Sequence, residues 1–302
     1  MSARSLNPRI ISVGECMVEM APTGEGTFAM GFAGDTLNTA WYLRRALPPE
    51  AEVDYLTAVG TDAISDRMLG FLRDAGLGTS RVARIPDRTV GLYLIELTDG
   101  ERSFAYWRGQ SAARLLARDP AVLAAGFAGA SMIYLSGITL AILEPADRSQ
   151  LLAALSAARA AGSAVAFDPN LRPRLWPDAA TMCAAIMEAA RHADIVLPSH
   201  EDEAAFFGDE DAAATAARYA AAGAALVVVK DGAGPMVTLT PEGQQSHAPE
   251  TVRQVVDTTA AGDSFNAGFL AAHIAGAPLA EAVRAGARLA ARVIGQRGAL
   301  VT

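Results

Sequence analysis

The sequence predicts an α/β fold, in which a mostly parallel central sheet is covered by helices on both faces and a small separate β-sheet is attached. Short apolar segments alternate with helical segments through the second half of the chain, as in buried parallel sheets. Two β-rich segments joined by Thr98-Asp99-Gly100-Glu101 interrupt that alternation and predict a hairpin. The 302 residues, 51% hydrophobic and 19% charged, are typical of a folded globular chain.

The elements follow from local composition and periodicity. Runs of β-branched and apolar residues predict strands at 10–18, 53–59, 90–97, 102–107, 132–136, 164–168, 195–197, 226–229 and 235–239. Helical spacing predicts helices from the 31–38 loop to about Arg45, at 63–75, up to Ala161, up to Arg191, near Asp202, at 262–274 and at 279–294. We therefore expect a single domain over 1–302, with a β lid from insertions at about 14–34 and 88–110.

Charge and composition exclude several classes of function. The net charge of −8, the pI of about 5.1 and the absence of a basic run argue against nucleic-acid binding. No apolar run reaches membrane-spanning length and no signal peptide is seen, so no membrane association is expected. Two cysteines predict no disulfide framework, and a cytoplasmic location is expected.

The segment VVDTTAAGDSFNAGF, residues 255–269, places a carboxylate at the start of an apolar helix. Ala260, Ala261 and Gly262 carry almost no side chain, so a ligand could approach their backbone, and a helix N-terminus favours an anion. Asp263 beside such an anion site is explained if it faces a hydroxyl whose proton leaves as phosphate arrives. A helix N-cap explains Asp263 equally well when the segment is taken alone.

Polar segments follow four predicted strands, at 168–172, 198–203, 230–234 and 257–263. Ligands of open α/β sheets bind at the carboxyl ends of strands, so these segments are expected along one rim. Neither a Walker A motif nor GxGxxG after the first strand is present, which disfavours P-loop and nicotinamide-dehydrogenase functions.

Three motifs resemble one family. DTTAAGDSFNAGF resembles the DTxGAGD signature of ribokinase-like (PfkB) sugar kinases, with Ala260 where Gly is commonest. GFAGDTLN, residues 31–38, resembles the family's Gly-rich sugar loop, and KDGAG, residues 230–234, resembles its nucleotide loop, with Pro235 in place of the last Gly. Within the family, GDTLN, GLY at 91–93, YWR at 106–108 and DPNLR at 168–172 are most similar to kinases of 2-keto-3-deoxygluconate.

The resemblance implies a ribokinase-like fold and a kinase that uses ATP and Mg²⁺. A monovalent cation is a further cofactor that the resemblance allows. Asp263 would be the general base, and Ala260, Ala261 and Gly262 would form the anion hole. The helix N-terminus is expected to keep Asp263 ionised and a weak base. The implied nucleotide-binding residues are Asn170, Arg172, Ser199, Lys230, Gly232, Ala233, Gly234 and the anion hole. Either Asp202 or Glu203 would act on the metal through water.

The implied substrate is a small sugar acid. Its hydroxyls and carboxylate would be bound by Gly34, Asp35, Thr36, Leu37, Asn38, Tyr93, Tyr106, Trp107, Arg108 and Arg172, together with Asp263. Arginine suits a carboxylate because it binds both oxygens. Capping, strand packing and surface ion pairs are the structural alternatives for these residues. The lid is expected to cover the sugar and to pair with another copy, giving a homo-oligomer.

Two other functions stay open at this point. A fructokinase, or another sugar or nucleoside kinase, would share the frame. A non-catalytic sugar or nucleotide sensor would keep the fold, although the intact Asp263 segment disfavours it.

Overall fold

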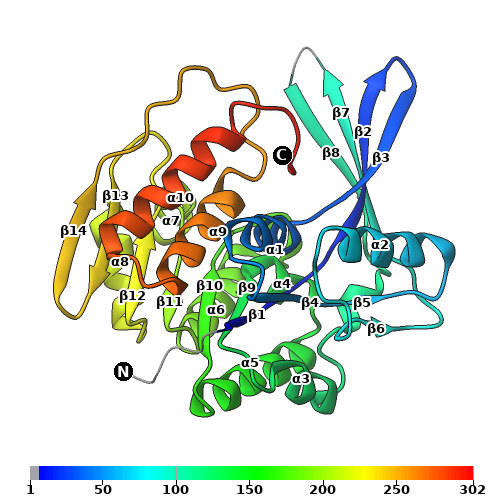
Figure 1. Ribbon diagram of the computed structural model, residues 1–302, viewed down its shortest axis with the longest axis horizontal. Helices are drawn as coiled ribbons and strands as arrows, with labels where there is room; N and C mark the ends of the chain where they lie inside the picture. The colour runs from blue at the N-terminus through cyan, green and yellow to red at the C-terminus, as the bar shows by residue number, and fades with distance from the viewer. Residues whose placement is uncertain (1–6, 99–100, 302) are drawn as a thin grey trace.

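The computed structural model describes residues 7–98 and 101–301, and its central feature is a sheet in the order β14-β13-β12-β11-β10-β9-β1-β4 (Figure 1). The strands from β4 to β12 in this order pair in parallel, and β13 and β14 add antiparallel at one edge. Their bounds are β1 Arg9–Val13, β4 Glu52–Leu56, β9 Met132–Ser136, β10 Ala164–Asp168, β11 Ile195–Val196, β12 Leu226–Val229, β13 Met236–Thr240 and β14 Gly243–His247.

Helices cover both faces of this sheet. One core packs it against α3 Pro120–Phe127, α4 Gly137–Ile142, α5 Pro145–Ala160, α6 Ala179–Ala190, α7 His200–Phe207 and α8 Ala212–Ala221. The other core packs it against α1 Asp35–Ala46, α2 Ala63–Asp74, α9 Ala261–Ile274 and α10 Leu279–Val293. Short 3₁₀ turns lie at Ala112–Leu115 and Pro173–Leu175. The predicted architecture of a mostly parallel sheet with helices on both faces is therefore confirmed.

A separate four-stranded sheet, in the order β3-β2-β7-β8, projects from the body (Figure 1). It consists of β2 Met17–Gly24, β3 Thr27–Ala33, β7 Gly91–Thr98 and β8 Glu101–Trp107. Thr98 pairs with Glu101 across the hairpin, while the predicted Asp99-Gly100 turn lies outside the described residues. A third, two-stranded sheet joins β5 Ala58–Val59 to β6 Ala83–Arg84.

Three predicted elements are divided in the structure. The strand expected at 10–18 breaks at Gly14, where a Cβ would lie 2.3 Å from Thr36 Oγ1, so the chain passes too close to α1 for a side chain. The strand expected at 53–59 divides at Thr57 into β4 and β5. The helix expected up to Ala161 divides into α4 and α5 because Pro145 starts a new helix.

Elements β6, α3, α8 and β14 had no counterpart in the prediction, and residues 31–33, expected in a loop, form the end of β3. Helices α3 and α8 are short and rich in alanine, so apolar periodicity marks them poorly. β14 is a polar edge strand with mostly exposed residues.

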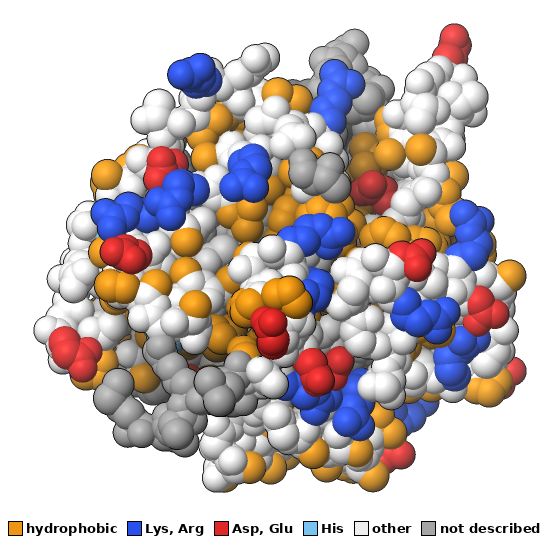
Figure 2. All heavy atoms as spheres, viewed as in Figure 1, with side chains coloured by type: hydrophobic (Ala, Val, Ile, Leu, Met, Phe, Trp, Pro, Cys, Tyr) orange, Lys and Arg blue, Asp and Glu red, His pale blue; other side chains and the backbone are white. Residues whose placement is uncertain are grey.

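Charged side chains of both signs occur on the surface of the protein. On the face shown in Figure 2, basic and acidic side chains are interspersed. Within residues 7–98 and 101–301, none of the helices combines the length and the apolar character needed to cross a bilayer.

Candidate active site

A cavity of about 210 Å³ lies at the carboxyl ends of β10 and β12 and the N-termini of α1 and α9. It is lined mainly by polar and small residues from the predicted segments. They are Asp35, Ile138, Asp168, Asn170, Arg172, Ser199, Asp202, Lys230, Thr258, Ala260, Ala261, Gly262 and Asp263. Asp35 and Asp263, which are 228 positions apart in the sequence, thus meet at one rim of the sheet, as expected for this class of sheet.

The start of α9 forms one wall of the cavity. Ala260 caps the helix in the left-handed conformation, with φ of 59°, which costs an L-residue about 1–2 kcal/mol. Asp257 holds the loop in place, because its carboxylate accepts hydrogen bonds from Thr259 N and Oγ1 and from Gly298 N. Ala261 N donates to Thr258 O at 3.2 Å. The other amides of a first helical turn have no intrahelical acceptor, so this end can receive an anion.

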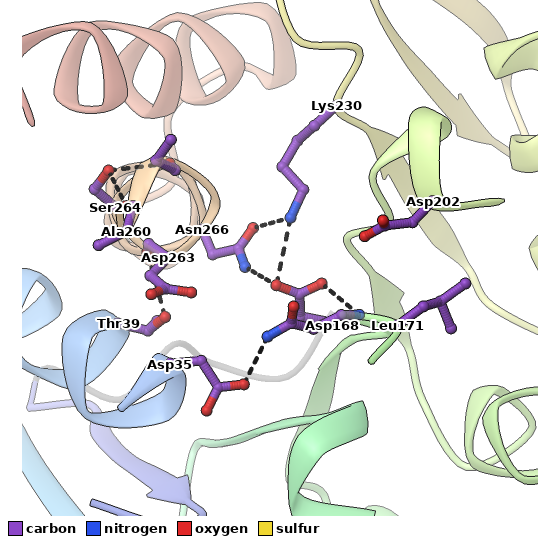
Figure 3. Close-up of polar contacts among 12 residues, drawn as sticks. Asp35, Thr39, Asp168, Leu171, Asp202, Lys230, Ala260, Asp263, Ser264 and Asn266 are labelled. Atoms are coloured by element: carbon purple, nitrogen blue, oxygen red, sulfur yellow. Dashed lines mark hydrogen bonds and ion pairs between the residues drawn. The ribbon is translucent and has the colours of Figure 1, made fainter. Parts of the chain in front are cut away.

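Asp263 lies on the first turn of α9 and faces α1. Asn38 Nδ2 donates to its Oδ2 at 2.8 Å. Thr39 Oγ1 donates to its backbone oxygen at 3.3 Å (Figure 3). Burial, and then the negative charge of Asp35, raise the pKa of Asp263 to about 7. The expectation that the helix N-terminus keeps this group a weak base is therefore wrong in direction, because desolvation exceeds the helix effect.

Asp35 forms a second acid at the cavity, on the first turn of α1. Its Oδ2 accepts from Asn170 Nδ2 at 2.8 Å and its Oδ1 from Thr36 N at 2.8 Å. Burial raises its pKa as well. Asn170 has φ of 36°, and this unusual backbone directs its amide toward α1. The sugar-loop and DPNLR segments are thus joined side chain to side chain.

Lys230 and Asp168 form a buried polar group with Asn266 of α9 (Figure 3). Lys230 Nζ lies 3.2 Å from Asn266 Oδ1 and 3.4 Å from Asp168 Oδ2. Asn266 Nδ2 donates to Asp168 Oδ2 at 2.7 Å and to Tyr134 Oη at 3.1 Å. No site role was assigned to Asp168 or Asn266 from the sequence, although Asn266 follows Asp263 by three positions and so shares its helix face.

The two acids expected at the metal separate in the structure. Asp202 lines the cavity, 3.6 Å from Arg172 Nη1, and burial raises its pKa. Glu203 is fully buried and accepts from Arg218 Nη2 at 2.7 Å and from Tyr219 Oη at 3.0 Å. The structure therefore brings Asp202, and not Glu203, to the cavity.

Mg²⁺ usually keeps several of its waters, and carboxylates can hold it through those waters. Asp202 and Asp168 both line the cavity and fit that requirement. Over the described ranges, no group of three acidic, histidine or cysteine side chains forms a direct metal cluster.

Several predicted sugar-binding residues lie outside the cavity lining. Thr36 and Leu37 are buried in α1, and Gly34 caps that helix. Tyr93 Oη bonds to Glu19, and Arg108 pairs with Glu15, which also accepts from Ser111.

Tyr106 and Trp107 are exposed on β8. Gly232, Ala233 and Gly234 follow β12 and do not line the cavity. Glu15 had no predicted role. In the sequence, only its position directly after Gly14 could have marked it as a residue of interest.

Comparison with known proteins identifies relatives of this arrangement. The chain matches the family described as "pfkB family carbohydrate kinase" over residues 7–301. It is 39% identical to "2-dehydro-3-deoxygluconokinase" of Escherichia coli (strain K12) over 303 residues, covering 98% of each chain.

Two solved structures are similar over nearly the whole chain. The PfkB protein from Polaromonas sp. JS666 has a TM-score of 0.82 and 30% identity, covering 95% of this chain and 96% of that one. The fructokinase with bound ATP from Xylella fastidiosa has a TM-score of 0.83 and 26% identity, covering 97% and 94%.

Proposed function

Because this chain belongs to the pfkB family of carbohydrate kinases, we propose that it transfers the terminal phosphoryl group of ATP to the terminal hydroxyl of 2-keto-3-deoxygluconate. The observation that carries the reaction is Asp263, a carboxylate with a pKa raised to about 7 beside the open N-terminus of α9. The observation that carries the substrate is the 39% identity to the Escherichia coli relative, which is named for that sugar acid.

Asp263 is proposed to accept the proton of the attacking hydroxyl. A base with a pKa near 7 takes up a proton more readily than an ordinary carboxylate and is still ionised in half of the molecules at neutral pH. Asn38 holds one carboxylate oxygen at 2.8 Å and leaves the other for the sugar. Asp35 and Asn38, both on the first turn of α1, are proposed to bind further sugar hydroxyls.

The N-terminus of α9 is proposed to bind the phosphoryl group during transfer. Ala260, Ala261 and Gly262 line the cavity with almost no side chain, so the phosphate oxygens reach the backbone amides. Mg²⁺, when bound, would neutralise phosphate charge, with Asp202 and Asp168 holding it through water.

Arg172 is proposed to bind the carboxylate of the sugar acid. Arg172 lines the cavity, and half of its side chain is exposed, so a ligand can reach it. Arg108, the second arginine expected there, already pairs with the buried Glu15. Recognition by Arg108 would therefore require a shared contact with Glu15 or rearrangement of that pair.

The substrate assignment is tested by comparing kcat/KM for 2-keto-3-deoxygluconate, fructose and a nucleoside. We expect the sugar acid to be best, and Arg172→Met to raise its KM at least about tenfold while fructose kinetics stay unchanged. A preference for fructose would make the chain a fructokinase.

Asp263→Asn should abolish turnover and retain sugar binding. Unchanged turnover would remove Asp263 from the mechanism, and a wild type without turnover would indicate a sensor.

The small sheet is proposed to cover the sugar and to pair with a second copy of the chain. Phe28, Phe104, Tyr106 and Trp107 are between 39% and 61% exposed on it. Exposed apolar side chains and free strand edges are features of association surfaces. Light scattering at assay concentration should give a dimer or a larger species, and a monomer would contradict this.

A further inference from the structure

Lys230 directs its ammonium toward the anion-binding end of the cavity. The residue directly follows β12 and is 9% exposed. A Cβ placed on Gly262 would lie 3.6 Å from Lys230 Nζ, so the ammonium is next to the backbone of the first turn of α9. We propose that Lys230 is a catalytic residue whose ammonium binds the phosphoryl group while it is transferred. This rests on phosphoryl transfer from ATP as proposed above, and not on the identity of the sugar.

The charges around the cavity create a need for such a cation. Four carboxylates, Asp35, Asp168, Asp202 and Asp263, line the cavity, and Lys230 and Arg172 are the cationic side chains in that lining. Arg172 is half-exposed and is 3.6 Å from Asp202. A negatively charged phosphoryl group entering between these acids is repelled unless a cation accompanies it, and a buried cation is screened least.

The contacts of Lys230 allow it to exchange partners. Its distance to Asp168 Oδ2, 3.4 Å, is longer than the 2.7–2.9 Å usual for a charge-assisted hydrogen bond. Asp168 also accepts from Asn266 Nδ2 at 2.7 Å and from Asn170 N at 3.2 Å. When the ammonium turns to a phosphate oxygen, Asp168 therefore keeps two hydrogen-bond donors.

The composition of the chain is consistent with a requirement for an ammonium at this position. The sequence contains 25 lysines and arginines, and Lys230 is the single lysine among them. A guanidinium is a wide planar fork, whereas an ammonium is a compact point charge. Lys230 Nζ lies between Asp168, Asn266 and the backbone of Gly262, where a compact cation fits.

Lys230 changes only its hydrogen-bond partners during the reaction. A bond forms between the sugar oxygen and the γ-phosphorus, and the bond from that phosphorus to the bridging oxygen of ADP breaks. The hydroxyl proton goes to Asp263. The ammonium donates hydrogen bonds to the phosphoryl oxygens, whose charge is most exposed in the transition state.

The kinetic test is Lys230→Met, which keeps the length of the side chain and removes its charge. We expect kcat to fall at least about 100-fold, the cost of losing one donor to a developing charge, while both KM values change less than about threefold. Arg67→Met, an exposed change on α2, is the matched control and should behave as wild type. A kcat within threefold of wild type, or a loss confined to the KM for ATP, would overturn the proposal.

A second test uses the wild-type protein and so does not depend on the variant folding. Labelling with [¹³Cε]lysine gives one side-chain signal, because Lys230 is the only lysine. With Mg²⁺ and no sugar, a non-hydrolysable ATP analogue should move this signal well beyond the shift caused by ADP. Equal shifts would place Lys230 on the nucleotide diphosphate and overturn the proposal, as would no shift with either. A wrong sugar assignment would leave this result unchanged.

Discussion

Asp263→Asn should abolish phosphoryl transfer and, above pH 7, make the protein more stable than the wild type. Burial and the neighbouring Asp35 raise the pKa of Asp263 from 3.8 to about 7 on folding. The native protein therefore binds this proton more tightly than the unfolded chain does. The stabilisation that the folded protein gains from protonated Asp263 is complete below about pH 4 and is lost as the pH rises toward 7.

The size of the effect follows from the same shift. Each unit of pKa difference is about 1.4 kcal/mol, and about two units develop between pH 5 and pH 8. The free energy of unfolding of Asp263→Asn relative to wild type should thus rise by roughly 2–3 kcal/mol over this range. The asparagine keeps the contact with Asn38, because its own carbonyl oxygen accepts the amide hydrogen that Asp263 accepts at 2.8 Å.

Urea unfolding at pH 5 and pH 8 measures this difference directly. Glu210→Gln, an exposed acid between α7 and α8, is the control and should change stability equally at both pH values. If Asp263→Asn is no more stabilising at pH 8 than at pH 5, the carboxylate is not costly in the folded protein. The raised pKa would then be wrong, and with it the reason for choosing Asp263 as base.

Three further predictions concern named positions. The kcat/KM of the wild type should rise about tenfold per pH unit up to about pH 7 and then level off, as Asp263 ionises; a flat profile would contradict its role. Ala260→Gly should raise the free energy of unfolding by about 0.5–1 kcal/mol in urea, because glycine removes the cost of φ of 59° and returns only part of it as chain entropy; a loss of stability would count against that strain. Arg218→Met should destabilise by about 3 kcal/mol at pH 8, since it leaves Glu203 buried without its cation, and by less at pH 5, where Glu203, whose pKa is raised to about 7, takes up a proton; equal losses at both pH values would contradict the pairing.

The sequence was most informative where a strand ends. The segments after β10, β11 and β12 and the start of α9 are polar or small in a chain otherwise rich in alanine, and parallel strands bring such ends together. Asn170, Lys230 and Asp263 were all expected at one rim, and all three line the cavity, together with Asp35 from the segment that resembles the sugar loop.

The missing information was mainly about side-chain direction and burial. A helix N-terminus can be predicted from a sequence, but the burial of Asp263 against α1 cannot. The direction of the pKa shift of Asp263 was therefore predicted wrongly. Asp202 and Glu203 are neighbours on a helix, and their roles separate only because Arg218 and Tyr219 of α8 meet one of them. The partner of Arg108, Glu15, precedes it by 93 positions, and no local pattern links the two.

The hydrogen bond between Asn38 and Asp263 has a consequence during protein synthesis. Its partners are 225 positions apart, and a ribosome adding about 5–20 residues per second needs roughly 10–45 s to make the second after the first. Until then the chain lacks both the proposed base and the proposed anion hole. Under the proposed mechanism, a chain that is still being translated, or that is released early, therefore cannot hydrolyse ATP or transfer its phosphoryl group to a wrong acceptor.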